Sequence, residues 1–189
     1  MIKKYAIADY TTAEEIKNVR KELNMTQKEF AKFIGSSKPT VERWECSDKK
    51  ISGPIILLLK ILKEYPEMSE KLMIPPKQLP IRMWYMYKNE KCTLIDVDDA
   101  KRVVQIKNYT DRIMFRAFGT NVEPTYDDYL VFLEDRCFPR TRDRLKLVLD
   151  DLGIPFYDPF LIVEKTKGKM AEDDFWIDIE RQYEVTSKL

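Results

Sequence analysis

The sequence predicts an α+β chain in which an all-α N-terminal domain precedes a small α+β C-terminal domain. Apolar residues recur at helical spacing from Ile16 to Leu62. Three prolines then fall within the six residues 75–80, where no helix can continue. Beyond Pro80, β-branched and aromatic residues gather in short segments typical of strands. We therefore expect domains at 1–72 and 81–189, joined by a proline-rich linker at 73–80.

The first two helices of the N-terminal domain have clear start signals. Thr11 or Thr12 begins a helix whose apolar residues stand three and four positions apart. Thr26 is a good N-cap for the second helix, and Glu29 three residues later completes a capping box. Gly35 supplies the C-terminal stop of this helix.

The third helix, expected at residues 37–46, has two different faces. Ser36 and Ser37 are candidate caps, and Pro39 is tolerated in the first turn, where backbone N–H groups lack partners. Val41 and Trp44 are predicted to face the core. Lys38, Thr40 and Arg43 then point outward. Two helices that present such a polar, basic face describe a DNA-binding helix-turn-helix.

Two further helices should complete this domain. Ser52-Gly53-Pro54 begins a very apolar helix that runs to about Glu64 and closes the core against the preceding helices. A short fifth helix is expected at 66–72. Nothing in this half exceeds a small helical domain.

The C-terminal domain is predicted to mix strands and helices. A hairpin is expected from 82–88 and 92–97 around a turn at 89–91, followed by strands at 102–107 and 113–118. Thr125 caps a helix, and a second helix runs from about Arg140 to Leu152, ended by Gly153. Residues 160–164 fit either a strand or a helix, and 175–179 alternate like a strand.

Composition limits the functions that the chain can have. No apolar run approaches the roughly 20 residues that span a bilayer, and no apolar stretch follows the N-terminus, so we expect a cytoplasmic protein without membrane contact. Three widely spaced cysteines indicate reduced thiols. The chain has no histidine, which removes the common triads and most zinc sites. We expect no enzyme, cofactor or metal.

Charge is distributed unevenly along the chain. Residues 1–80 hold 15 Lys and Arg against 11 Asp and Glu, whereas the remainder holds 18 against 21. A mildly basic N-terminal half fits contact with phosphates.

The motif of the second and third helices resembles a known family. From Thr26 to Glu45 the chain reads Thr-Gln-x-Glu-Phe-Ala-x-x-Ile-Gly-x-Ser-x-x-Thr-Val-x-x-Trp-Glu, which is similar to the Xre/Cro-type helix-turn-helix of bacterial and phage regulators. The resemblance covers about Thr12 to Tyr65 and implies a five-helix domain that binds double-stranded DNA. Cys46-Ser47 replace the glycine usual after Trp-Glu, so the exit from the third helix differs.

This resemblance assigns roles to individual residues. Gln27 would contact phosphate or support the recognition helix, and Ser37, Lys38, Thr40 and Arg43 would reach base edges or phosphates. Arg is the side chain best shaped for guanine, and a Thr methyl group can meet a thymine methyl group. Further phosphate contacts, independent of base sequence, are expected from Lys28, Lys49 and Lys50. The alternative is an ordinary solvated helix face.

The C-terminal half carries a second resemblance. Residues 136–142, then 149–153, then 168–177 are similar to the N-terminal portion of HipA-type toxin proteins, with motifs R-x-I-P-x-S-R and G-x-S-x-x-D-x-Y-W-I. Thr141 replaces the serine of the first motif, and the elements of a kinase core do not follow. The likeness implies an accessory or interaction module and not a kinase.

Several charged or reactive groups have simpler interpretations. Arg136, Arg140, Arg142 and Arg144 lie near acidic residues, which favours local ion pairs over an anion or acidic-partner site. Asp96, Asp98 and Asp99 suggest a turn and not a calcium loop. The acids at 127–128 and 172–174 fit the first turns of helices. Cys137 has no histidine to activate it.

The sequence therefore predicts a sequence-specific DNA-binding transcriptional regulator, a repressor of antitoxin type that acts as a homodimer. It reads the major groove with helix 37–46. One alternative is a protein-interaction module whose C-terminal domain holds a toxin, such as a HipA-type toxin. Another is a regulator that senses a small molecule through its aromatic residues Trp84, Tyr85, Tyr87, Tyr157 and Trp176.

Overall fold

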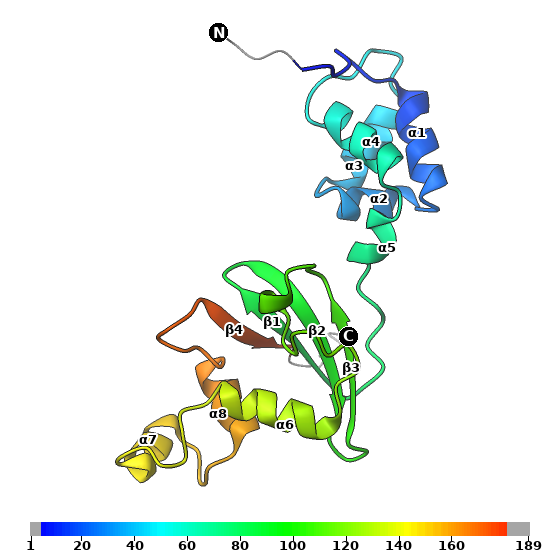
Figure 1. The fold of residues 1–189 in the computed structure, drawn as a ribbon. Helices are drawn as coiled ribbons and strands as arrows, with labels where there is room; N and C mark the ends of the chain where they lie inside the picture. The colour runs from blue at the N-terminus through cyan, green and yellow to red at the C-terminus, as the bar shows by residue number, and fades with distance from the viewer. Residues whose placement is uncertain (1–4, 181–189) are drawn as a thin grey trace, which may run out of the picture. The chain divides into compact units, whose positions relative to one another are not determined.

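The chain forms an α+β structure, as expected from its sequence. The computed structural model describes residues 5–180 and divides the chain into two compact units, Met1–Ile74 and Pro75–Leu189. The first unit is helical, and the second contains a four-stranded sheet with helices (Figure 1). The division lies inside the proline-rich segment 73–80.

Residues 5–74 of the first unit form five helices, and the first three have the expected side-chain caps. Each side chain of Thr12, Thr26 and Ser37 accepts a hydrogen bond from the backbone N–H three residues later, and Thr26 with Glu29 forms a complete capping box. Pro54, expected at the first position of the fourth helix, is its N-cap, so this helix begins one position later, at Ile55. The helices are α1 (Ala13–Glu22), α2 (Gln27–Phe33), α3 (Lys38–Glu45), α4 (Ile55–Glu64) and α5 (Met68–Leu72).

One hydrophobic core holds the first four helices together. Ile16, Phe30 and Val41 are fully buried, and each comes from a different helix. The apolar face of α4 packs against them through Ile55, Leu59 and Leu62, as the sequence predicted. Trp44 is partly buried at the edge of this core.

The sheet of the second unit is antiparallel throughout. Its strands are β1 (Ile81–Tyr87), β2 (Glu90–Asp98), β3 (Val103–Asn108) and β4 (Phe175–Ile179), in the order β3-β2-β1-β4. β4, the last strand in the sequence, is therefore an edge strand paired with the first. The helices between β3 and β4 connect these two edges.

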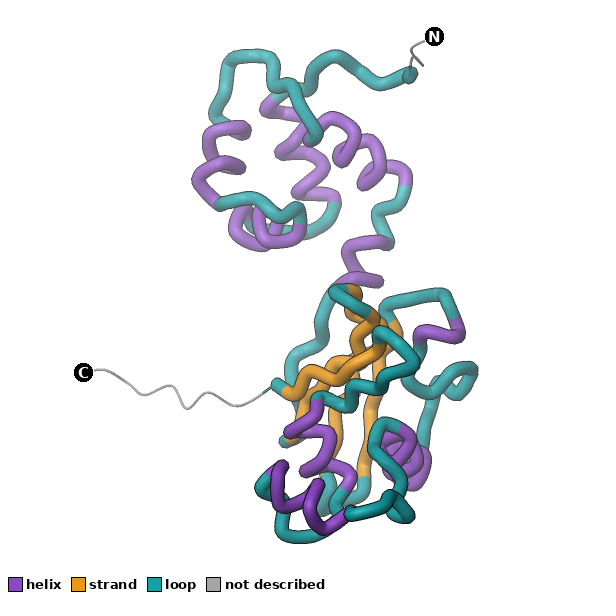
Figure 2. Tube along the Cα trace, turned by 90° about the vertical axis from the view of Figure 1, so that its left-hand side faces the viewer, coloured by secondary structure: helices purple, strands orange, loops and turns teal. Residues whose placement is uncertain are grey.

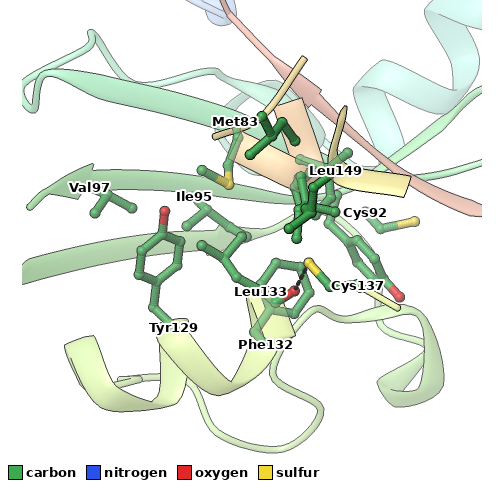
Figure 3. Close-up of a cluster of buried hydrophobic side chains, with 14 residues drawn as sticks. Met83, Cys92, Ile95, Val97, Tyr129, Phe132, Leu133, Cys137 and Leu149 are labelled. Carbon is green, nitrogen blue, oxygen red and sulfur yellow. Dashed lines mark hydrogen bonds between the residues drawn. The ribbon is translucent and has the colours of Figure 1, made fainter. Parts of the chain in front are cut away.

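Those helices cover one face of the sheet. They are α6 (Tyr126–Asp135), α7 (Leu145–Leu152) and α8 (Pro159–Thr166), and they lie below the strands in Figure 1, with α7 farthest from the sheet. Figure 2 shows them in purple, together with a short helical segment at Ile113–Phe115. Figure 3 shows Phe132 and Leu133 of α6 among Met83 and Ile95 of the strands. Side chains alternate along a strand, so Met83 and Tyr85 of β1 and Ile95 and Val97 of β2 enter this core. Cys92 of β2 joins them beyond a register shift between Tyr85 and Met86.

The opposite face of the sheet carries a second buried cluster without a covering helix among residues 75–180. Trp84, Met86 and Leu94 are buried there. Beside them, Arg82 donates to both carboxylate oxygens of Asp96 at 2.7 and 2.6 Å and to the Pro75 carbonyl at 2.9 Å. The ion pair is buried on both sides, and it ties the proline-rich segment to the sheet.

Three predictions about loops and strands were wrong. The hairpin turn is Lys88-Asn89, because β2 already begins at Glu90. Residues 113–118 form a short 3₁₀ helix at Ile113–Phe115 and a turn in place of a strand, because Arg116 donates to the Thr110 carbonyl and folds the segment back. Asp96 and Asp98 lie inside β2 and not in a turn.

Two predictions about helices also need correction. α7 begins at Leu145 and not near Arg140, because Arg144 adopts a left-handed conformation (φ +55°) that breaks the helical path. The acidic segment 172–174 precedes strand β4 and does not open a helix. Residues 160–164, left open between strand and helix, belong to α8.

Candidate nucleic-acid interface

The α2–α3 pair is joined by a tight turn. Ile34 ends α2, and Ser37 begins α3. The Ser36 N–H donates to the Ala31 carbonyl at 2.8 Å, which closes the turn against the end of α2. The turn therefore fixes the angle between the two helices through backbone bonds.

Glu45 at the end of α3 ties this helix to α1 and α2. Arg20 of α1 donates to Glu45 Oε1 at 2.6 Å and to Oε2 at 3.0 Å, and Gln27 of α2 donates to Oε2 at 2.9 Å. The same Arg20 donates to the Met25 carbonyl at 2.8 Å. A planar guanidinium with several fixed donors restricts orientation as well as distance. α3 is thus held in one position relative to the other two helices.

Burial and hydrogen bonding act in opposite directions on the pKa of Glu45. Burial of its carboxyl group raises the pKa, but the hydrogen bonds from Arg20 and Gln27 outweigh burial, so the pKa lies below its ordinary value. Glu45 is therefore ionised at neutral pH and holds its partners as a carboxylate. Only 4% of its side chain is exposed.

The outer face of α3 carries both charge signs. Lys38 and Arg43 are exposed, as the sequence predicted, and Thr40 is half-buried at the flank. Lys38 Nζ lies 2.8 Å from Glu42 Oε1, one helical turn away. Arg43 forms no ion pair with any residue of the described part of the chain, so its guanidinium is available to a partner.

Two hydroxyl groups at the start of α3 bond to each other. The Ser37 and Thr40 hydroxyl oxygens lie 2.8 Å apart, and Ser37 Oγ also accepts from the Thr40 N–H at 3.3 Å. Ser37 therefore acts first as the helix cap. Both side chains stay close to solvent, so a ligand at the start of α3 meets them as a pair.

The remaining predicted contact residues do not form one cluster. Lys28 is exposed in the first turn of α2, and Lys49 is exposed in the loop after α3. The loop is ordered by Ser47, whose hydroxyl accepts from the Lys49 N–H at 3.1 Å. Lys50 places its ammonium 3.9 Å from the centre of the Tyr10 ring. No hydrogen bond or ion pair between described residues joins these lysines to α3.

Sequence reasoning missed the roles of Arg20 and Glu45. The capping and periodicity signals concern residues at most four positions apart, whereas these two are separated by 25. One residue did point to this contact, because Gln27 was expected either to support the recognition helix or to contact phosphate. The structure places its amide on Glu45, which is the supporting role.

In the second unit, Arg136 joins two segments that are distant in sequence. Its guanidinium donates to Asp173 Oδ2 at 2.7 Å and Oδ1 at 3.1 Å, and to the carbonyls of Gly168 and Phe175 at 2.9 Å each. The hydrogen bond from Arg136 lowers the pKa of the Asp173 carboxyl group below its ordinary value. Arg140 pairs with Glu134 at 2.7 Å. Arg136 and Arg140 therefore have their charges matched by local ion pairs.

Cys137 lies in the buried core of the second unit. Burial raises the pKa of Cys137 to about 12, and its thiol donates to the Leu133 carbonyl (Figure 3). Within residues 5–180 no three Cys, Asp or Glu side chains are placed to hold a metal ion together. No helix in this range is long and apolar enough to span a membrane.

The aromatic residues considered for ligand sensing lie mainly within the packing of the unit. Trp84 and Tyr85 are buried. Tyr85 stacks on Phe175 with ring centres 4.9 Å apart, and Tyr87 stacks on Phe115 at 4.5 Å. These contacts give the rings structural partners.

Comparison with known proteins relates the first unit to bacterial antitoxins. Residues 1–73 match the family described as "Antitoxin component of bacterial toxin-antitoxin system, MqsA". The chain is also 33% identical over 54 residues to "Antitoxin HigA-2" of Vibrio cholerae serotype O1 (strain ATCC 39315 / El Tor Inaba N16961). That match covers 29% of this chain and 52% of the relative, so the chain spans about half the length of the curated relative it matches. The first unit is therefore antitoxin-like. Neither match is described as a HipA-type protein, so the HipA-type resemblance of the second unit stays a prediction.

Proposed function

We propose that the protein is a DNA-binding regulator of antitoxin type that reads double-stranded DNA with residues 37–46. The observation that carries this proposal is the exposed Arg43 on a helix whose position is fixed by the Glu45 contacts. A side chain can discriminate between bases only if its helix docks in one orientation. The similarity of residues 1–73 to antitoxins supports the same conclusion.

The proposed contacts separate into two kinds. Arg43 and Thr40 would contact base edges, since guanidinium groups suit guanine and a Thr methyl group suits thymine. Lys28, Lys38 and Lys49 would contact phosphates, together with the start of α3 at Ser37. Gln27 acts by holding α3 through Glu45. Contact with operator DNA would give repression by blocking access to the site.

A direct test compares three variants of the full chain in DNA-binding titrations at several salt concentrations. Arg43→Ala is expected to weaken specific binding by about 1–3 kcal/mol and to relax preference at one base position. Glu42→Gln releases Lys38 from its ion pair and is expected to strengthen binding to all sequences. Lys21→Ala, an exposed cation on α1, is the control and should bind as wild type.

The outcome that contradicts the proposal is equally specific. If Arg43→Ala bound DNA with wild-type affinity and sequence preference, α3 would not be the reading helix. A binding constant without a steep salt dependence would also exclude phosphate contact. The first unit would then serve protein interaction alone.

Homodimer formation through α4 is part of the proposal. Leu57 and Ile61 stand four residues apart on α4 and are 45% and 42% exposed, which gives an apolar stripe, and Tyr65 at the C-cap of this helix is 50% exposed. A two-fold interface brings the same stripe from both copies together, and two reading helices match a palindromic site. Ile61→Glu is expected to yield a monomer in sedimentation. A dimer of unchanged stability would exclude this stripe as the interface.

A protein partner for residues 81–189 is the second proposed function. The antitoxins that the first unit resembles are named as components of toxin–antitoxin systems, and the open edge of β4 supports the same role here. Co-purification of a toxin expressed with this chain tests this role. Loss of the toxin on deleting residues 75–189 would support it, and retention would place the partner on the first unit.

A further inference from the structure

We infer that the outer edge of β4 and the neighbouring α8 form a docking groove for an extended, basic and apolar peptide segment of a protein partner. This inference rests on the proposed partner-binding role of residues 81–189, and it names the site and the chemistry. It is independent of DNA reading by the first unit.

The direction of the backbone groups of β4 follows from two backbone hydrogen bonds. The Glu180 N–H donates to the Arg82 carbonyl, and the Lys88 N–H donates to the Asp174 carbonyl. Groups alternate along an antiparallel strand, so residues 174, 176, 178 and 180 bond to β1. The N–H and C=O groups of Phe175, Ile177 and Ile179 therefore point away from β1, toward the open edge.

The first half of this edge already has partners. Phe175 donates its N–H to Asp173 Oδ1 at 2.9 Å and accepts from Arg136 Nη2 at 2.9 Å. The Ile177 N–H donates to the Lys167 carbonyl at 2.7 Å. These bonds block strand addition there. Natural proteins commonly protect sheet edges in such ways.

The second half of the edge is open. The Ile177 carbonyl and both backbone groups of Ile179 have no hydrogen-bond partner among residues 5–180. One residue of an added parallel strand can donate to the Ile177 carbonyl and accept from the Ile179 N–H. This is the hydrogen-bond pattern by which extended peptides add to exposed sheet edges.

A groove lies along the same open edge. It has a volume of about 590 Å³ and runs between α8 and β4, with Val163 and Ile179 among its apolar lining residues. In Figure 1, β4 lies at the edge of the sheet with α8 beneath it. Alternate side chains of an added strand would face α8, and this lining favours apolar residues at those positions.

The charges beside the groove indicate which residues suit the peptide positions whose side chains do not face α8. Among the described residues, the acids Glu164, Asp178 and Glu180 line it, together with the cation Lys167. The Glu180 carboxylate accepts from Trp84 Nε1 at 2.9 Å, so it lies on the face of the sheet opposite α8. Lysine or arginine residues in the peptide would meet these acids. An alternating basic and apolar segment therefore complements both sides of the groove.

The same charges disfavour a second copy of this chain as the occupant. Two β4 edges pairing about their two-fold axis would bring Asp178 and Glu180 of one copy against the same acids of the other. Like charges directly opposite each other destabilise a strand pair. A basic peptide from another protein fits the groove, whereas β4 of a second copy does not.

The test measures binding of a fluorescein-labelled Lys-Val-Lys-Ile-Lys-Val-Lys peptide to the full chain by fluorescence anisotropy. Asp178→Lys is expected to weaken binding at least about tenfold, as is Ile179→Pro, which removes an outward N–H and leaves the β1 bonds in place. Asp143→Lys changes the net charge equally at an exposed site away from the groove, and it should bind within about twofold of wild type. DNA binding should be unchanged in all three.

A backbone-modified peptide keeps the test decisive if Ile179→Pro does not fold. Methylation of the backbone nitrogens of the third and fifth residues of the peptide, both lysines, removes the donors that face β4 and should weaken binding at least about tenfold, whereas glutamates in place of lysines should abolish it. Three results overturn the inference: no saturable binding up to about 1 mM peptide, equal loss in Asp143→Lys and Asp178→Lys, or no effect of N-methylation. Self-association of the chain that Asp178→Lys strengthens would instead assign the edge to a second copy. Loss of DNA binding with peptide binding intact would contradict only the DNA-reading function.

Discussion

Arg20 and Glu45 form a two-point ion pair that connects the first helix to the end of the third, with N–O distances of 2.6 and 3.0 Å. The pair is largely buried, since the side chains are 12% and 4% exposed. Gln27 adds a third donor from the second helix. The orientation of the proposed reading helix therefore depends on residues outside its exposed face.

Removing Arg20 should destabilise the first unit. Arg20→Met leaves a buried carboxylate without its main partner, and we expect a loss of about 2–3 kcal/mol. Because the chain has two units, hydrogen exchange of the amides in α1 to α3 measures this loss better than global unfolding does. With Glu45→Gln, a double-mutant cycle should give a coupling energy of about 1–3 kcal/mol.

The exposed pair of Lys38 and Glu42 is the matched control. Its side chains are 52% and 42% exposed, so Lys38→Met should change stability by no more than about 0.5 kcal/mol. A coupling energy near zero for Arg20 and Glu45 would mean that the buried pair contributes no more than this exposed one.

Acid should weaken the first unit through Glu45. The pKa of this group in the folded state lies below the ordinary value of 4.5. Its stabilising contribution is therefore fully present above pH 4.5 and is lost as the pH falls through the folded-state pKa. We expect Glu45→Gln to remove part of the stability difference between about pH 6 and pH 3, measured by hydrogen exchange corrected for intrinsic rates. Identical pH profiles for the two proteins would contradict this linkage.

Gly168 and Gly153 provide a comparison between strain and packing in the second unit. Both have positive φ, +56° and +68°. A Cβ on Gly168 would lie 3.2 Å from Arg136 Cβ and 3.3 Å from Ile177 Cδ1, whereas a Cβ on Gly153 would meet nothing within 4 Å. Gly153→Ala should cost about 1–2 kcal/mol from backbone conformation alone.

Gly168→Ala should lower the free energy of unfolding by roughly 1 kcal/mol more than Gly153→Ala does, because the Arg136 network and Ile177 must also shift. Urea unfolding monitored by near-ultraviolet circular dichroism, to which Trp84 and Trp176 contribute, measures both variants. Equal costs for the two substitutions would show that the Arg136 region adjusts without strain.

The features that could be read from the sequence are those encoded by neighbouring residues. Thr26 with Glu29 and Thr125 with Asp128 specify helix starts through bonds that span three positions. The β-branched and aromatic composition of β1 and the alternation in β4 likewise require only local residues. Residues 113–118 misled the prediction because their strand-like composition is overridden by a bond from Arg116 back to Thr110.

The candidate sites divide in the same way. Exposure of Lys38 and Arg43 follows from helical spacing around the buried Val41, so the sequence predicted it. Arg20 supports that face through a contact with Glu45, 25 positions away. The guanidinium of Arg136 likewise binds Asp173, 37 positions away, and no local pattern indicates either contact.

By itself, the sequence determined the fold class, most helices and strands, and the outward face of the third helix, because hydrogen bonds and periodicity within a few residues encode them. Only the tertiary structure decided that β4 pairs with β1, which leaves the Ile177 carbonyl and the backbone groups of Ile179 without a partner among residues 5–180. Strand order depends on which distant segments bury their apolar faces together, and no local pattern specifies that choice.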